Sequence, residues 1–250
     1  MNPLGWLRGH SNGIAWKSAG VSNVGKIRTL NEDEFMDMPQ RRLWAVADGM
    51  GGHAAGDVAS GVVIHALAKL GNAEKLNSAS GNVAAAIENA NSMLRFVANE
   101  RGKDVVIGTT IVAAVARGDR MAILWAGDSR AYRLRGNHFE QLTRDHDLLT
   151  DMKEQNAPAE LIDAMKSNVI SRAVGAHEKI NIDEIRVEVR QHDVFLLCSD
   201  GLYREVPEHQ IKAILREKDP ARSSALLVEA ALSAGARDNV TVVVIRANPI

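Results

Sequence analysis

Short apolar runs rich in β-branched residues recur along the chain of 250 residues and are separated by polar turns. Runs of this length and composition are typical of buried β-strands. The four residues that join the runs 109–116 and 121–125 include Gly118 and Asp119, which are typical of a hairpin turn. The predicted strands are 43–47, 109–116, 121–125, 131–134, 182–189, 194–197 and 240–245.

Longer stretches with apolar residues at helical spacing lie between these runs. The predicted helices are 54–70, 82–99, 208–217 and 220–234. Pro207 and Pro220 stand where a first helical turn tolerates proline. Residues 146–167 form a polar, helix-prone insertion between strands. Hairpins followed by helix pairs predict an α+β fold with antiparallel sheets instead of regular βαβ repeats.

Composition adds limits to this picture. A chain of this length suits one large domain, so we expect a single domain over residues 1–250. The net charge of -1 gives no electrostatic attraction to nucleic acid or to an anionic membrane. No apolar stretch is long enough for a signal peptide or a membrane span. Cys198 is the single cysteine, which excludes an internal disulfide and favours a cytoplasmic protein.

Aspartate stands beside an apolar run at four places in the chain. Asp48, Asp128 and Asp200 each follow such a run, and Asp238 precedes one. A single aspartate beside glycine at a strand end is usually a turn residue. Four together indicate a shared site, because buried carboxylates that converge repel one another unless a cation lies between them. Carboxylate oxygens suit Mg²⁺ or Mn²⁺, and the chain has no Cys/His spacing typical of zinc.

A further acidic pair, Glu32 and Asp33, follows Arg28. An exposed run of charged residues is the alternative interpretation of this segment. The presence of Arg28 favours a functional interpretation of this segment. A guanidinium can bind a phosphoryl group through two hydrogen bonds while metal ions bind the other phosphoryl oxygens.

In their order along the chain, these segments resemble the PP2C family of protein phosphatases, also called PPM, in its bacterial form. Each segment is a weak signal, but the ordered set is specific and spans residues 20–245. The segments are Arg28-x-x-Asn31-Glu32-Asp33, Val46-Ala47-Asp48-Gly49-Met50-Gly51-Gly52-His53, Gly108-Thr109-Thr110, Ala126-Gly127-Asp128-Ser129-Arg130, Asp145-His146, Ser171-Arg172-Ala173-Val174-Gly175, Ser199-Asp200-Gly201-Leu202 and Arg237-Asp238-Asn239-Val240-Thr241.

The resemblance implies a set of metal ligands. Asp48 would bridge two metal ions, and the carbonyl group of Gly49 would bind one of them. Asp200 and Asp238 would complete the ligands of the second ion. Asp128, sharing Asp200, would help to hold a third and weaker ion.

The same resemblance implies roles for residues around the metals. Glu32 and Asp33 would hold metal-bound waters or lie just behind the ligands, and Arg28 would bind the substrate phosphate. Gly175 and the insertion near 145–175 would form a flap beside the site. The implied fold is a four-layer α-β-β-α sandwich, with two antiparallel sheets flanked by helix pairs.

The implied activity is hydrolysis of phosphoserine and phosphothreonine in proteins, with Mn²⁺ or Mg²⁺ as cofactor. Two divalent ions lower the pKa of a shared water, which attacks phosphorus in line, and Arg28 and the metals stabilise charge on the phosphoryl oxygens. The catalytic set would be Arg28, Asp48, Asp200 and Asp238. Expected partners are phosphoproteins, with a cognate bacterial Ser/Thr kinase or its substrate among them, and regulation of type VI secretion is a further implication. We expect a monomer without a nucleic-acid partner.

The proton donor is open. Animal family members carry a histidine two residues after the bridging aspartate, where this chain has Met50. His53 or a metal-bound water could act as general acid, and His53 is otherwise a residue at the start of a helix.

Three rival interpretations were weighed. A pseudophosphatase that only binds is disfavoured because Asp48, Asp200 and Asp238 are all present. A small-molecule phosphohydrolase stays open, since metals do not recognise the leaving group. Cys198 and Arg204 have the C-x5-R spacing of tyrosine phosphatases, but the acidic residues around them would repel a thiolate.

Overall fold

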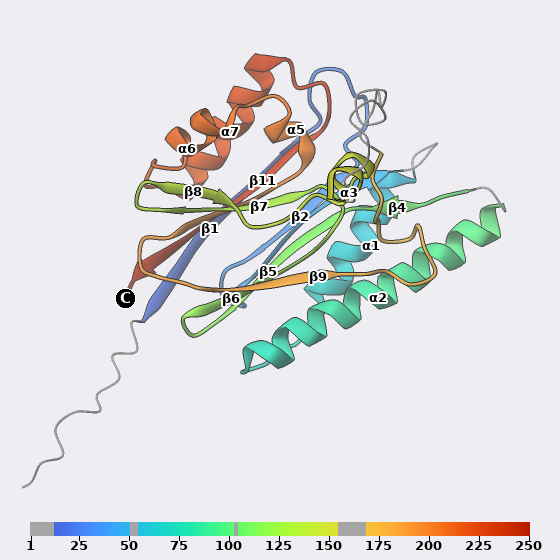
Figure 1. The fold of residues 1–250 in the computed structure, drawn as a ribbon, viewed down its shortest axis with the longest axis horizontal. Coiled ribbons are helices and arrows are strands. Elements are labelled where there is room, and N and C mark those ends of the chain that lie inside the picture. Colours follow the sequence, from blue (N-terminus) through green and yellow to red (C-terminus); the bar gives the residue numbers. More distant parts are fainter. Residues whose placement is uncertain (1–12, 51–54, 103–104, 155–168) are drawn as a thin grey trace, which may run out of the picture.

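The computed structural model describes residues 13–50, 55–102, 105–154 and 169–250. Two antiparallel β-sheets pack against each other, with helices over the outer face of each sheet (Figure 1). One sheet has the strand order β1-β11-β10-β7-β8, and the other has the order β2-β3-β5-β6-β9, with β4 paired to β3. The strands are β1 Ile14–Asn23, β2 Asp33–Met38, β3 Leu43–Met50, β4 Gly108–Thr109, β5 Ile111–Arg117, β6 Arg120–Ala126, β7 Arg130–Arg135, β8 His138–Gln141, β9 Asp183–Glu188, β10 Val194–Cys198 and β11 Val240–Pro249.

Central strands are apolar on both faces because both faces are covered. In β3, Trp44 and Val46 belong to the core between the two sheets. Leu43 and Ala45 point to the opposite face, where they pack with residues of the helices. For this reason β3 is a continuous apolar run in the sequence instead of an alternating one.

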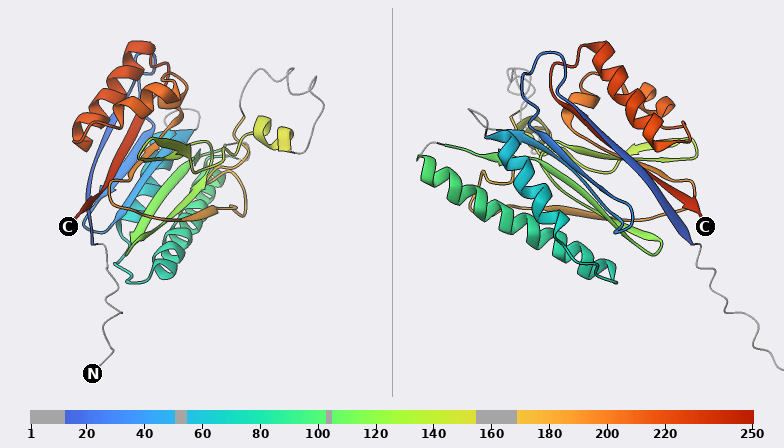
Figure 2. Two further views of the ribbon diagram at one scale, coloured as in Figure 1. Left: turned by 60° about the vertical axis from the view of Figure 1, so that its left-hand side comes forward. Right: turned by 180° about the vertical axis from the view of Figure 1, so that it is seen from behind.

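Each sheet has its own helices. Helices α1 (Gly56–Ala68) and α2 (Leu76–Arg101) cover the sheet that contains β3 and β5. Helices α6 (Glu208–Ile214) and α7 (Pro220–Ala234) lie on the other sheet, where α7 packs on β1 and β11 (Figure 2). This order of layers confirms the predicted α-β-β-α sandwich.

Two short helices complete the fold. Helix α5 (Asp200–Tyr203) follows β10 directly. Helix α3 (Leu148–Glu154) stands out from the sandwich. It occupies the first part of the predicted insertion, whose residues 155–168 lie outside the described residues. No helix in the described part of the chain is long and apolar enough to cross a membrane.

The predicted strands are all present, and the hairpin is confirmed because Arg117 of β5 pairs with Arg120 of β6. Gly118 in this turn has φ of 60°, a conformation that glycine adopts without strain. The predicted helix bounds differ from the observed ones most at the start of α2 and the end of α6. Helix α2 begins at Leu76 instead of residue 82, because buried Ala79 and Val83 pack into the core and outweigh the weak helix propensity around them. Helix α6 ends at Ile214 instead of 217, since the chain then turns into the proline that opens α7.

Candidate metal centre

Five aspartates meet where the two sheets adjoin at one end of the sandwich. Asp33 begins β2 and Asp48 lies near the end of β3, and the register pairs the two residues. Asp128 lies in the turn between β6 of one sheet and β7 of the other. Asp200 follows β10, and Asp238 precedes β11. The Asp48 carboxyl interacts electrostatically with the other four carboxyls, so the structure brings the predicted acids together.

Burial makes the carboxyls of Asp33, Asp48 and Asp128 hard to ionise. It raises the pKa of Asp33 to about 7 and that of Asp128 to about 6, and neighbouring carboxylates add to both shifts. Burial, followed by repulsion from the other four aspartates, also raises the pKa of Asp48 well above its ordinary value. A cation among these groups would favour their ionised forms.

Unpartnered oxygens give an independent sign of what the site can hold. Asp33, Asp128 and Asp200 are 7%, 2% and 8% exposed, and within the described residues one oxygen of each carboxyl is buried without a hydrogen bond. Leaving such an oxygen unsatisfied costs on the order of 1–3 kcal/mol, and more for a charged group. Buried oxygen donors of this kind fit Mn²⁺ or Mg²⁺.

Arginines hold other oxygens of the same carboxyls. Nη2 of Arg28 lies 2.8 Å from Oδ2 of Asp238. Arg204 contacts both Asp128 and Asp200, at 3.1 Å and 3.0 Å. Within the described ranges, no three His, Cys, Asp or Glu side chains are already grouped closely enough to hold a metal ion, although the five aspartates lie near one another. The donor chemistry therefore fits a divalent cation, with arginines as the present partners.

Arg28 stands on a loop that Asn239 anchors. The Asn239 amide donates to the carbonyl groups of Val24 and Leu30, at 2.9 Å and 3.0 Å, and accepts from the backbone N–H of Glu32 at 2.9 Å. The side chain of Arg28 is half exposed, and its ion pair with Asp238 raises its pKa. The loop therefore presents a guanidinium beside the carboxyls and open to solvent.

Hydroxyl groups next to the aspartates hold them in position. Ser199 donates to Asp33 at 2.7 Å, and its Oγ accepts from the Thr241 backbone N–H at 3.0 Å. The Asp48 backbone N–H donates to Oγ1 of Thr110 at 3.1 Å. Sequence reasoning included these residues in the family segments without giving them roles. Only Ser199 stands beside an aspartate in the sequence, so no such signal marks Thr110 or Thr241.

Glu32 and Gly49 lie against the start of α1. The Gly56 backbone N–H donates to Oε1 of Glu32 at 3.2 Å. A Cβ atom on Gly49 would lie 2.1 Å from the Gly56 carbonyl oxygen and 2.6 Å from that of Glu32. The close approach of β3 to α1 therefore requires glycine at position 49. This is a structural reason for glycine at a position that is also predicted to be a metal ligand.

The described base of the insertion is tied to the turn that carries Asp128. The backbone N–H of Gly127 donates to Nδ1 of His146 at 3.2 Å, so Nε2 of His146 carries the proton and donates to Asp183 at 3.1 Å. Arg172 binds Asp183 at 3.0 Å. Residues on both sides of the insertion therefore contact one network.

The remaining predicted residues either lie outside the described part of the chain or have a structural explanation. His53 and the insertion residues 155–168 lie outside the described residues. Gly175 has φ of 93°, and a Cβ there would lie 2.2 Å from the carbonyl oxygen of Ile107. Cys198 is fully buried in β10, and burial raises the pKa of its thiol, which agrees with the rejected thiolate mechanism.

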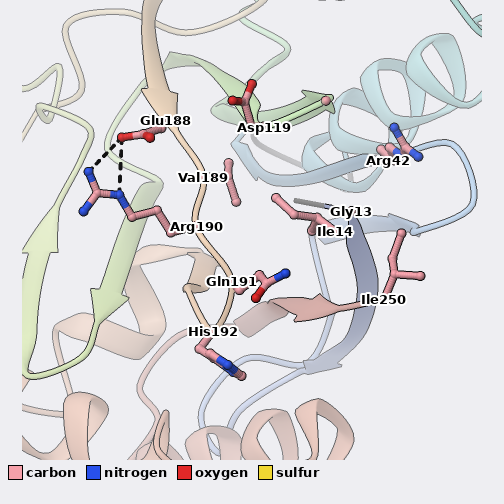
Figure 3. Close-up of a pocket in the computed structure, with 11 residues that line it drawn as sticks. Gly13, Ile14, Arg42, Asp119, Glu188, Val189, Arg190, Gln191, His192 and Ile250 are labelled. Atoms are coloured by element: carbon pink, nitrogen blue, oxygen red, sulfur yellow. Dashed lines mark hydrogen bonds and ion pairs between the residues drawn. The ribbon is translucent and has the colours of Figure 1, made fainter. Parts of the chain in front are cut away.

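A cavity of about 780 Å³ lies elsewhere, between Arg42, the turn at Gly118 and Asp119, and Ile250 (Figure 3). Arg42 precedes β3, whose far end carries Asp48. The turn at Gly118 joins the ends of β5 and β6 that point away from Asp128. This cavity is therefore at the opposite end of the strands and does not belong to the carboxylate site.

Comparisons with known proteins agree with this geometry. The family model described as Protein phosphatase 2C matches residues 26–229. The chain is 37% identical over 233 residues to the serine/threonine protein phosphatase PstP of Mycobacterium tuberculosis, covering 92% of this chain but 45% of that protein. The chain thus spans less than half the length of that relative.

Solved structures give the same result. PppA, described as a key regulatory component of T6SS in Pseudomonas aeruginosa, is 39% identical with a TM-score of 0.85, covering 93% of this chain and 97% of that one. The catalytic domain of a PstP phosphatase in complex with two manganese ions is 35% identical with a TM-score of 0.83, covering 94% and 100%. The chain belongs to the protein phosphatase 2C family.

Proposed function

We propose that this chain is a metal-dependent protein phosphatase that hydrolyses phosphoserine and phosphothreonine. The observation that carries the proposal is a set of buried aspartates whose oxygens lack hydrogen-bond partners within the described part of the chain, near the half-exposed guanidinium of Arg28. Family membership and the manganese complex of a PstP catalytic domain support it. Two bound ions, Mn²⁺ or Mg²⁺, would neutralise phosphoryl charge and lower the pKa of a shared water.

The protein's own groups have distinct tasks in this proposal. Asp48, Asp200 and Asp238 would hold the core ions, and the carbonyl of Gly49 would be a further ligand. Asp128 would serve a weaker third position. These assignments agree with the raised pKa of the Asp48 carboxyl, because a nearby cation would favour its ionised form.

The residues around these ligands position them and the substrate. Asp33 and Glu32 lie behind the ligands and hold water and backbone in place. Arg28 binds the substrate phosphate: a guanidinium has five donors, so it can keep Asp238 and still donate to two phosphoryl oxygens. For the proton donor, His53 stays our proposal, tested by comparing good and poor leaving groups in His53→Ala.

The test is hydrolysis of a phosphothreonine peptide by the whole chain with Mn²⁺, with EDTA, and with Asp48→Asn. We expect turnover only with Mn²⁺ and a loss of at least 100-fold in Asp48→Asn. The matched control is Asp119→Asn, an exposed aspartate in the hairpin turn at the other end of the strands. Turnover in EDTA equal to that in Mn²⁺ would contradict the proposal.

Two outcomes of this assay identify the rival functions. Small phosphate esters turned over far better than phosphopeptides would indicate a small-molecule phosphohydrolase. Phosphopeptide binding without turnover at any metal concentration would indicate a pseudophosphatase.

The biological setting is a finer part of the proposal. We place a single monomeric domain, with a flap near 145–175, in the cytoplasm, opposing a bacterial Ser/Thr kinase. The similarity to PppA supports a role in regulating type VI secretion. Phosphothreonine-containing proteins that accumulate when the gene is deleted would identify the substrate, and an unchanged phosphoproteome would contradict this setting.

A further inference from the structure

Arg204 joins two of the buried carboxyls that lie on different loops. It follows α5 directly, and its backbone N–H donates to the Asp200 carbonyl at 3.0 Å. Its guanidinium places Nη1 3.0 Å from Oδ2 of Asp200 and Nη2 3.1 Å from Oδ2 of Asp128. One forked side chain therefore spans the turn after β6 and the end of β10.

The two carboxyls are buried, whereas the arginine reaches solvent. Asp128 and Asp200 are 2% and 8% exposed, and each keeps one buried oxygen without a partner among the described residues. The side chain of Arg204 is 42% exposed and lines a cavity of about 200 Å³ together with Glu205, Arg237 and others. The guanidinium therefore reaches solvent and borders a cavity that Asp238 also lines.

Neighbouring groups hold the arrangement in place. The Tyr203 hydroxyl donates to the Asp128 backbone carbonyl at 3.0 Å. The guanidinium of Arg130 lies 3.6 Å above the Tyr203 ring and is bound to Asp145. The pairing of Arg204 thus belongs to a connected set of contacts, in which each partner restrains the next.

A guanidinium and a divalent cation compete for the same carboxylate oxygens. Both neutralise negative charge, and placing both between Asp128 and Asp200 would set like charges a few ångströms apart, where repulsion in a buried site is strong. We propose that Arg204 is a built-in counterion for Asp128 and Asp200, and that a divalent cation binds this pair only by displacing it. The chain thereby limits occupancy of the metal position between Asp128 and Asp200, and Asp200 is also one of the proposed core ligands.

This inference rests on the proposed two-metal function but is tested by counting bound ions. Free Mn²⁺ is measured by electron paramagnetic resonance as the whole chain is titrated, without substrate, for the wild type and Arg204→Ala. We expect two equivalents in the wild type and one additional equivalent in Arg204→Ala, with at least tenfold higher affinity than any third equivalent of the wild type. Arg204→Ala/Asp128→Asn should lose that equivalent.

Two further variants distinguish competition between the guanidinium and the metal ion from a general loss of structure. Arg237→Ala removes a guanidinium that lines the same cavity but pairs with Glu205, so it should keep the wild-type stoichiometry. Arg204→Lys keeps the charge but loses the fork, so the affinity for the third ion should be intermediate. If Arg204→Ala fails to fold, Arg204→Lys alone still decides between a gain of affinity and none.

Metal-free stability is a second readout. In EDTA, Arg204→Ala should melt at a lower temperature than the wild type, because two buried carboxyls lose their counterion, and Asp128→Asn in that background should restore part of the loss. A folded Arg204→Ala protein with the wild-type number and affinity of ions overturns the inference. A wild type that binds no Mn²⁺ contradicts the proposed function instead; Arg204→Ala then supports the inference by binding one equivalent and overturns it by binding none.

Discussion

The surroundings of the buried carboxyl groups at this site disfavour the ionised form. Asp33 shows this most clearly, because it is nearly buried in β2 opposite Asp48 and its pKa is raised to about 7. In the unfolded chain the same group ionises near 3.8. The two states therefore bind different numbers of protons over a window that includes neutral pH.

The stability of the metal-free protein should consequently fall as pH rises through this window. Between pH 3.8 and about 7 the folded state keeps the Asp33 proton that the unfolded state has lost, so the free energy of unfolding decreases with pH. Asp33→Asn should remove part of this slope, on the order of a few kcal/mol over the window. Urea unfolding in EDTA at several pH values measures it, with exposed Glu229→Gln as control. Equal slopes for the wild type and Asp33→Asn would count against the prediction.

Arg28 should act on substrate binding through the geometry of its fork. Arg28→Ala should lower kcat/KM for a phosphothreonine peptide by about 100-fold, and Arg28→Lys should recover only part, since an ammonium group lacks the paired donors. Most of the change should appear in KM. The comparison is Arg222→Ala, a 70% exposed arginine on α7. Full activity in Arg28→Lys would show that charge alone suffices.

For single residues, the sequence predicted which acidic side chains lie close together, but not which side chains contact them. A carboxylate at a strand end is visible in the sequence because the apolar run before it is visible. The contact of Ser199 with Asp33 and the fork of Arg204 depend on how distant segments meet, and the first pair is separated by 166 positions in the sequence. The spacing of Arg204 in the sequence relates it only to Cys198, whereas the structure places it against two aspartates.

Elements bring these residues together by approaching closely, and glycine makes the approach possible. At Gly49 a Cβ would collide with two backbone carbonyl oxygens, which cannot move without shifting β3 or α1. At Gly61 on α1, nothing lies within 4 Å of the same added atom. The chain therefore offers a matched pair of glycines around one helix.

Replacing each with alanine should have opposite effects on stability. Gly49→Ala should destabilise the protein by about 2 kcal/mol or more, since backbone must shift, and should weaken Mn²⁺ binding. Gly61→Ala should stabilise it by about 0.5–1 kcal/mol, because alanine favours the helix. Chemical unfolding of both variants in EDTA measures the difference. A neutral Gly49→Ala would refute the close-packing argument.

Some elements were hidden from sequence reasoning for physical reasons. Strand β1 contains glycine, serine and only weak alternation, yet it pairs along its whole length with the strongly apolar β11. Strand β2 reads as an acidic run because Asp33, Glu34 and Asp37 fall within it. Pairing with β3 supplies the stability that its own composition does not.

The whole molecule assembles the site from both sheets. Asp33 and Asp48 come from one sheet, Asp200 and Asp238 from the ends of strands in the other, and Asp128 lies between them. Apolar patterning predicted the strands, whereas the four-layer stacking followed from family resemblance. Periodicity alone does not determine which sheet a strand joins.

A cation bound by ligands of both sheets should stabilise the entire sandwich. At Mn²⁺ about 100-fold above its dissociation constant, linkage gives about 2.7 kcal/mol, or roughly 5–10 °C in Tm for a chain of this size. Asp48→Asn should reduce the shift strongly, and Asp119→Asn should leave it unchanged. Differential scanning fluorimetry with and without Mn²⁺ provides the measurement. A Tm that is unchanged by Mn²⁺ would contradict a metal site built from both sheets.

The pairing of β1 with β11 also determines how the molecule would respond to tension. These strands run antiparallel from Ile14 opposite Pro249 to Asn23 opposite Val240, and the Ile250 N–H donates to the Gly13 carbonyl. A pulling force between residues 13 and 250 therefore acts on one end of the β1–β11 pairing and breaks its hydrogen bonds one after another. The peeling ends at Asn23, just before the loop that carries Arg28, so mechanical opening would displace the arginine proposed to bind phosphate while the second sheet is still intact.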